Sequence, residues 1–244
     1  MLKSIISLSE FEYNEMRMRP NLLLLMFLMV VPLSVIAFDE VTSEQLEKWF
    51  EDDEQDHPFD RKSDGGTLVF LQAPPLKQAP QSSNILTIRS QSLETGWVAI
   101  DQCHAQLDPI HRVEVVYQYQ AMRNLRITET SGIRRAWVEG QSVQLEGVQQ
   151  GARLCVQAEA KILYRQDDKH YLLRNGPFQR RFLDSYFPMH LSLTIRYPDD
   201  LLSFQGISPA ATGGFNISPE KGAIRVDTWF EGKLLIEFEF KSVL

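Results

Sequence analysis

The residues from Asp101 to His111 form the densest group of side chains that could do chemistry, because Cys103, His104 and His111 lie close together there. Thiolate and imidazole are ligands that soft metals such as copper prefer. The spacing matches no standard zinc or copper motif, and a disulfide at Cys103 would remove both a metal ligand and a possible cysteine nucleophile. We therefore predict no metal and no cofactor, with His104 and His111 as weak metal candidates only.

Three arginines, Arg174, Arg180 and Arg181, form a second group beside the one long interruption of the strand pattern. The aromatic and leucine residues that follow have a spacing typical of one helical face, which predicts a short helical crossover near 178–187. The arginines would then point outward, and guanidinium groups bind carboxylates bidentately. We predict a partner-binding cluster that receives either an acidic partner or the protein's own acidic arm; the alternative is a structural crossover with solvated arginines.

Motifs of common catalytic sites are absent from the sequence. No serine lies in a Gly-x-Ser-x-Gly turn, no His-Glu-x-x-His occurs, and Thr212-Gly-Gly-Phe215 lacks the lysine and the spacing of a phosphate-binding loop. We expect the protein not to be an enzyme, while an exported hydrolase with an unrecognised site stays open as an alternative.

A charged flank and a short apolar run, Leu22 to Ile36, precede Ala37 and are typical of a secretory signal peptide. Cleavage after Ala37 would give a mature protein that begins at Phe38 and has no stable membrane insertion. The fifteen residues before Met16 contain three acidic residues and are atypical of a signal peptide, so a translation start at Met16 or Met18 is an alternative. The alternative is an uncleaved anchor, but a spanning helix needs about 20 apolar residues, and this run is shorter and contains Pro32. We predict export, to a bacterial periplasm or to the outside of the cell.

The two cysteines, Cys103 and Cys155, are the only ones in the chain. An even pair in an exported protein usually forms a disulfide, and closing a loop of about fifty residues would stabilise the fold by about 4 kcal/mol. Two buried thiols that act as small hydrophobic side chains are the alternative. We predict a Cys103–Cys155 disulfide.

Negative charge is concentrated in residues 38–60, which hold ten acidic residues against one basic residue, Lys48, whereas residues 61–244 have a net charge of +2. A body without a strongly basic face is not suited to nucleic acid, so we predict no nucleic-acid partner. Within this acidic arm, Thr42 to Phe50 has the spacing of a short amphipathic helix. Its Trp49 and Phe50 would contact either the protein's own body or a partner groove.

From Asn84 onward, β-branched and aromatic residues alternate with polar ones in short segments separated by turn signals at Gly132, Gly147 and Gly151. The clearest segments are 85–89, 97–100, 112–120, 125–128, 136–138, 142–145, 152–164, 171–174, 191–197, 224–230 and 234–240. The last two, joined through Gly232, are predicted to form a hairpin. Many short strands of this kind predict an all-β fold, mainly an antiparallel β-sandwich.

A true immunoglobulin domain is disfavoured, because Trp137 comes too late after the first cysteine and Arg153 occupies the position expected for a tyrosine. We predict a signal peptide over 1–37, an acidic arm with a proline-rich linker over 38–83, and a β-sandwich body over 84–244. The body could divide near 175 into 84–175 and 176–244.

These features together predict an exported, non-catalytic binding or assembly protein of unknown specific role. It would engage an envelope or secreted protein through a sheet edge or the arginine-rich crossover, because an exposed edge recruits strands through backbone hydrogen bonds. A small outer-membrane β-barrel is a further alternative, although many predicted strands are shorter than the roughly 9 to 11 residues needed to cross a membrane.

Overall fold

The computed structural model describes residues 3–7, 66–182 and 185–243. These residues belong to one of two compact units, Met1–Ser9 together with Ser63–Leu244. Most of the predicted signal peptide, the acidic arm and the predicted helix with Trp49 and Phe50 lie outside the described residues. No helix among the described residues has the length and apolar character needed to span a membrane.

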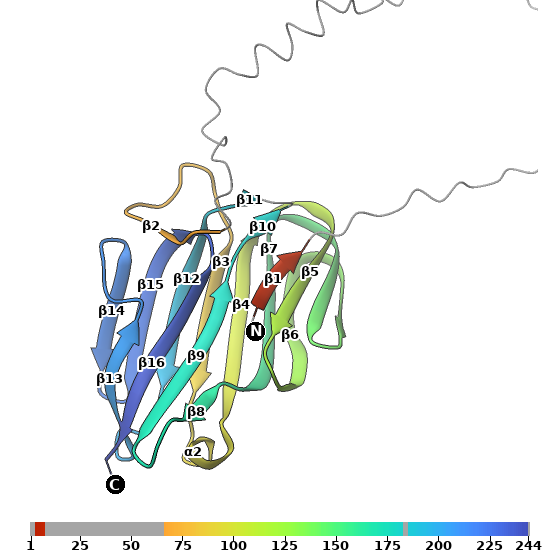
Figure 1. The fold of residues 1–244 in the computed structure, drawn as a ribbon. Coiled ribbons are helices and arrows are strands. Elements are labelled where there is room, and N and C mark those ends of the chain that lie inside the picture. Colours follow the sequence, from red (N-terminus) through yellow and green to blue (C-terminus); the bar gives the residue numbers. More distant parts are fainter. Residues whose placement is uncertain (1–2, 8–65, 183–184, 244) are drawn as a thin grey trace, which may run out of the picture. The chain divides into compact units, whose positions relative to one another are not determined.

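The described chain is nearly all β-structure, as the sequence predicts, and its one short helix is α2 (Ser92–Thr95). The strands are β1 (Lys3–Ser7), β2 (Val69–Leu71), β3 (Gln81–Thr87), β4 (Trp97–Leu107), β5 (Ile110–Gln118), β6 (Met122–Glu139), β7 (Ser142–Lys161), β8 (Leu163–Arg165), β9 (His170–Phe178), β10 (Arg181–Phe182), β11 (Ser185–Tyr186), β12 (Met189–Arg196), β13 (Leu202–Ser208), β14 (Phe215–Glu220), β15 (Ala223–Glu231) and β16 (Leu234–Ser242). They form a mixed ten-stranded sheet, an antiparallel four-stranded sheet and a small two-stranded hairpin (Figure 1).

The long strand β7 organises one half of the ten-stranded sheet. β6 pairs along one side of β7, while β4 and β5 follow each other along its other side. β3 then pairs with β4, and β1 pairs with β5. The other half continues from β3 through β12 and β15 to β14 and β2, and the β3–β12 pair is parallel.

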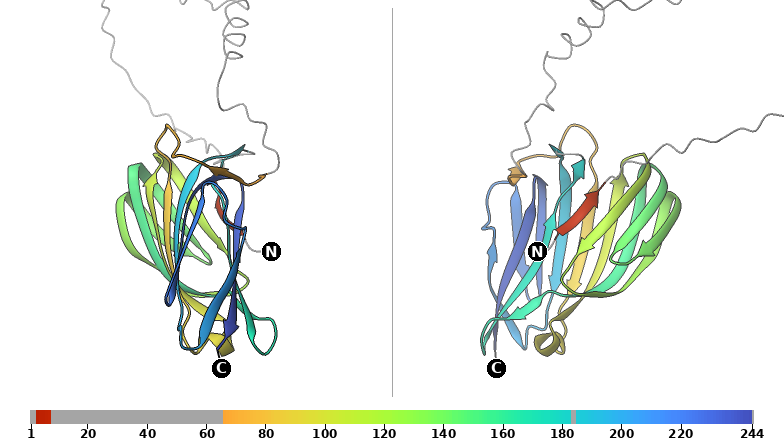
Figure 2. Two further views of the ribbon diagram at one scale, coloured as in Figure 1. Left: turned by 90° about the vertical axis from the view of Figure 1, so that its left-hand side faces the viewer. Right: turned by 45° about the vertical axis from the view of Figure 1, so that its right-hand side comes forward.

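The four-stranded sheet has the order β13, β16, β9, β8. In Figures 1 and 2 its strands β9 and β16 run across the face formed by β3, β12 and β15. Alternate residues of both sheets are buried in one hydrophobic core, for example Leu191 and Leu193 of β12 and Ile236 and Phe238 of β16. The period of two in the sequence therefore reflects burial of one side of each strand.

Three glycines that the sequence analysis assigned to turns lie inside long strands, so this expectation is wrong. Gly132 lies within β6, and Gly147 and Gly151 lie within β7, all three with positive φ angles between 63° and 76°. Glycine adopts such angles without the steric cost of a Cβ atom, which permits irregularities within a strand pair. The register between β6 and β7 shifts at three places, and segments predicted as four strands form one long hairpin.

The predicted hairpin of 224–230 with 234–240 is also wrong. The two segments are strands, but β15 belongs to the ten-stranded sheet and β16 to the four-stranded sheet. The turn at Gly232 therefore carries the chain from one sheet to the other. Alternation of apolar and polar residues is expected both for a hairpin and for two strands in different sheets. In either case the apolar side chains of the two strands face the same interior.

The predicted helical crossover near 178–187 is contradicted, because its described residues contain the short strands β10 and β11, which pair as a hairpin. β9 continues through Gly176 and Pro177 to Phe178, where the register with β16 shifts. A proline is tolerated at such an irregularity because no ladder hydrogen bond from its nitrogen is needed there.

Candidate binding surfaces

The predicted disulfide is confirmed: Cys103 on β4 and Cys155 on β7 are directly opposite each other in the register and are joined by a bond. Such a bond is weakly consistent with an exported protein. The alternation along β4 places Ala99 and Asp101 on the same face as Cys103, whereas Ile100 and His104 lie on the buried face.

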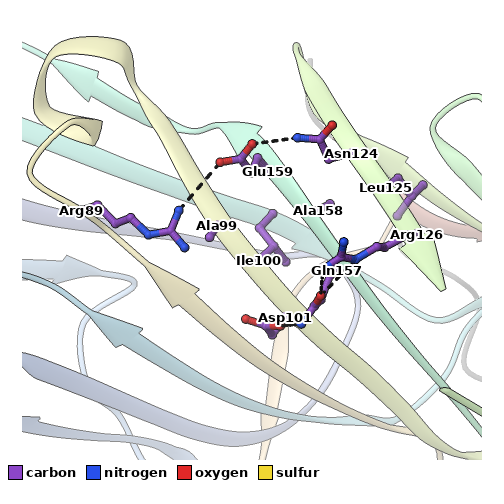
Figure 3. A pocket seen from close by; sticks show the side chains of 10 residues that line it. All are labelled: Arg89, Ala99, Ile100, Asp101, Asn124, Leu125, Arg126, Gln157, Ala158 and Glu159. Atoms are coloured by element: carbon purple, nitrogen blue, oxygen red, sulfur yellow. Dashed lines mark hydrogen bonds and ion pairs between the residues drawn. The ribbon is translucent and has the colours of Figure 1, made fainter. Parts of the chain in front are cut away.

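A hollow of about 600 Å³ lies on this disulfide-bearing face, over β4, β6 and β7 (Figure 3). Its lining combines charged and amide side chains with small or apolar ones: Arg89, Ala99, Ile100, Asp101, Asn124, Leu125, Arg126, Gln157, Ala158 and Glu159. Apart from Arg89, every lining residue comes from the three adjacent strands, so the sheet itself fixes the site.

Glu159 is the best-compensated charge in the hollow. Its carboxylate accepts hydrogen bonds from the Arg123 Nε atom at 2.9 Å and the Asn124 Nδ2 atom at 3.0 Å, while the Arg89 Nη1 atom lies 4.0 Å away. The hydrogen bond from Arg123 is the main reason why the pKa of Glu159 is lowered. Glu159 therefore remains ionised and is not suited to act as a proton donor near neutral pH.

Arg126 and Asp101 are connected through the amide of Gln157. Arg126 donates to Gln157 Oε1 from Nε at 3.2 Å and from Nη2 at 2.6 Å, and Gln157 Nε2 donates to Asp101 Oδ1 at 2.5 Å. The lining includes no serine, cysteine or histidine. The hollow thus offers both hydrogen-bond donors and carboxylate acceptors to a polar ligand.

The three predicted partner-binding arginines contact different groups. Arg174 lies 2.6 Å from Glu237 on the neighbouring strand β16. Arg180 donates to Asp108 Oδ2 at 2.5 Å, and its side chain is only 22% exposed. Arg181 lies beside the ring of Tyr186, with 5.9 Å from its guanidinium carbon to the ring centroid. An external anion would have to compete with the protein's own carboxylates at Arg174 and Arg180.

The two weak metal candidates do not share an environment. His111 on β5 is exposed, whereas His104 is buried, and burial lowers the pKa of His104 to about 4. His104 lies opposite Ser82 in the register, next to the buried polar pair Asn84 and Gln102. Among the described residues no group of three or more histidine, cysteine or acidic side chains could hold a metal ion.

The edge of β5 forms a further candidate surface, which the sequence analysis did not locate. β1 pairs with it antiparallel, with Lys3 opposite Gln118 and Ser7 opposite Glu114. β1 also lies beside β9 and β10, so its backbone runs between β5 on one side and these two strands on the other (Figures 1 and 2). We call this position of β1 between the strands the slot.

Contacts between the two walls hold this slot at both ends. At one end, the Tyr119 hydroxyl donates to Asn175 Oδ1 on β9 at 3.0 Å. At the other end, Arg180 binds Asp108, which precedes β5, and also donates to the carbonyl oxygen of Pro188. Neither contact uses a residue of β1, so the described residues of the body brace the slot themselves.

The other described edges carry features that discourage strand addition. β6 has three register shifts, β13 has one, β14 contains Pro219, and β2 and β8 are three residues long. Irregular, short or proline-containing edges resist pairing with another chain. By contrast, β5 pairs with both β1 and β7 without a register shift and contains no proline.

No protein-family model matches this chain, and no curated protein is significantly similar to it.

Proposed function

We propose that this protein is an exported, non-catalytic binding or assembly protein whose β-sandwich body takes up an extended strand of another protein at the β5 edge. The observation that carries the proposal is the pairing of β1 with Glu114–Gln118. A strand distant in sequence, which lies within the predicted signal peptide, occupies a regular edge in a braced slot.

Strand addition needs little more from the protein than a regular edge with accessible backbone groups. Removal of residues 1–37 on export would also remove β1 and leave the backbone of Glu114–Gln118 without that partner strand. An unpaired, regular edge of five residues is a template for another chain. The Cys103–Cys155 disulfide, in the strands next to this edge, supports an oxidising compartment for the mature protein.

The proposal can be tested with the full chain and a labelled peptide that corresponds to residues 2–8. Ile5→Pro removes a backbone donor from β1 and should displace it from the edge. We expect the Ile5→Pro chain to bind the peptide at least tenfold more tightly than the unaltered chain, measured by fluorescence anisotropy. A peptide with the same proline substitution is the matched control and should not bind.

Hydrogen exchange on the same samples locates the peptide. Bound peptide should protect those amides of Glu114–Gln118 that point away from β7, which alternate along the strand, while the β6 and β14 edges serve as internal references. If the peptide leaves these amides unprotected, or if the proline-containing peptide binds equally well, the proposal is wrong. The processed form recovered from its host should behave like the Ile5→Pro chain.

A further inference from the structure

We infer that the partner strand carries a hydrogen-bonding side chain, an amide or a longer hydroxyl-bearing group, at the position opposite Tyr117. This inference rests on the proposed function and adds the side-chain chemistry of the partner. It starts from two buried polar atoms on the walls of the slot that have no hydrogen-bond partner among the described residues, the Tyr117 hydroxyl and Gln179 Oε1.

Tyr117 belongs to the β5 wall, and in the register it lies opposite Ser4 of β1. Only 1% of its surface is exposed. Burial, with a smaller contribution from the neighbouring Tyr119, raises the pKa of Tyr117, so its hydroxyl keeps its proton and can both donate and accept. Tyr119, which directly follows β5, is also buried, but its hydroxyl donates to Asn175 Oδ1 and is therefore satisfied.

Gln179 belongs to the opposite wall, between the end of β9 and the start of β10, the two strands that lie beside β1. Its side chain is 3% exposed, and its Oε1 atom can only accept a hydrogen bond. The slot therefore has a donor-acceptor group on one wall and an acceptor on the other.

An unpaired buried polar atom costs about 1–3 kcal/mol, and native structures leave few of them. Neither atom has a hydrogen-bond partner among the described side chains, so a strand that satisfies both must supply a donor or an acceptor to each. A partner strand with an amide side chain at this position offers both a donor and an acceptor, and can reach further than serine. We therefore expect the natural partner to carry such a residue opposite Tyr117, where β1 has Ser4.

The test compares peptides that differ only at this position, using the full Ile5→Pro chain. The parent peptide is residues 2–8, and the variants replace the residue corresponding to Ser4 by glutamine, asparagine or alanine. We expect glutamine or asparagine to strengthen binding at least fivefold relative to the parent and alanine to change it less than twofold. When Tyr117→Phe is added to the Ile5→Pro chain, the gain from the side-chain amide should disappear, while binding of the alanine peptide should be retained.

Each outcome separates the inference from the proposed function. Suppose that every peptide binds and protects the backbone amides of β5, but that glutamine or asparagine gives no gain in affinity, or the same gain in the Tyr117→Phe chain. The inference is then wrong and strand addition stands. If no peptide binds, strand addition itself fails. The unfolding midpoints of the Tyr117→Phe chain and the unaltered chain are the control for misfolding. They should differ by no more than the loss of one unpaired hydroxyl explains.

Discussion

Removal of the Cys103–Cys155 disulfide should destabilise the protein strongly. The bond closes a loop between residues 52 positions apart. In the chain-entropy model, a crosslink of this span removes enough freedom from the unfolded chain to stabilise the fold by about 4 kcal/mol. Because the two residues are already opposite each other in adjacent strands, the native pairing of β4 with β7 does not depend on the bond. The disulfide should therefore stabilise the protein mainly by restricting the unfolded chain.

The assay is urea unfolding of the oxidised protein, the reduced protein and a Cys103→Ala, Cys155→Ala double variant. We expect the double variant to lose about 4 kcal/mol, which corresponds to a fall of roughly 10 °C in the melting temperature for a chain of this size. Reduced protein should agree with the double variant to about 1 kcal/mol. The reasoning is refuted if both lose less than about 1 kcal/mol, or if reductant changes only the double variant.

Three further predictions concern single side chains. The free energy of unfolding should fall by up to about 3 kcal/mol as the pH drops from about 6.5 towards 4. Burial lowers the pKa of His104 to about 4 in the folded protein, so the histidine of the unfolded chain takes up its proton first. In denaturant titrations a His104→Gln variant should lack this part of the pH dependence. Gly232→Ala should cost more than about 2 kcal/mol in thermal melts, since its Cβ would lie 2.1 Å from a backbone oxygen, whereas Gly140→Ala meets no atom within 4 Å and should cost clearly less. Arg180→Ala should cost about 1–2 kcal/mol, and a double-mutant cycle with Asp108→Ala should give a coupling near 1 kcal/mol; additive effects would show that this ion pair does not brace the slot.

The all-β class of the fold could be predicted from the sequence. Burial of one face of a strand makes apolar residues recur at every second position, as along Val98 to His104 of β4. It was insufficient for the assignment of strands to sheets. β15 and β16 have the same alternation that a hairpin would have, and only the presence of β12, β14 and β2 beside β15 shows that its pairing positions are already occupied. Glycines such as Gly147 mark positive φ, which turns and strand irregularities share.

The candidate binding surfaces were harder to predict, because the residues that form them are distant in the sequence. The Asp108–Arg180 pair joins positions 72 residues apart, and the sequence analysis had assigned Arg180 to an outward-facing helix. The disulfide was predictable because only one pairing of two cysteines exists. The β5 edge has no sequence signal of its own, since an edge strand and a central strand have the same alternation when one face is buried.

The parallel pair of β3 with β12 has a consequence for the order of folding. It joins Gln81–Thr87 to His190–Arg196, so the ten-stranded sheet cannot be completed until more than a hundred further residues are available. Contacts of such long range are formed late and slowly, because the entropy of closing the intervening loop is lost before the contact contributes. The parallel pair therefore forms late, whereas the local β6–β7 hairpin, whose strands are adjacent in the sequence, can form early.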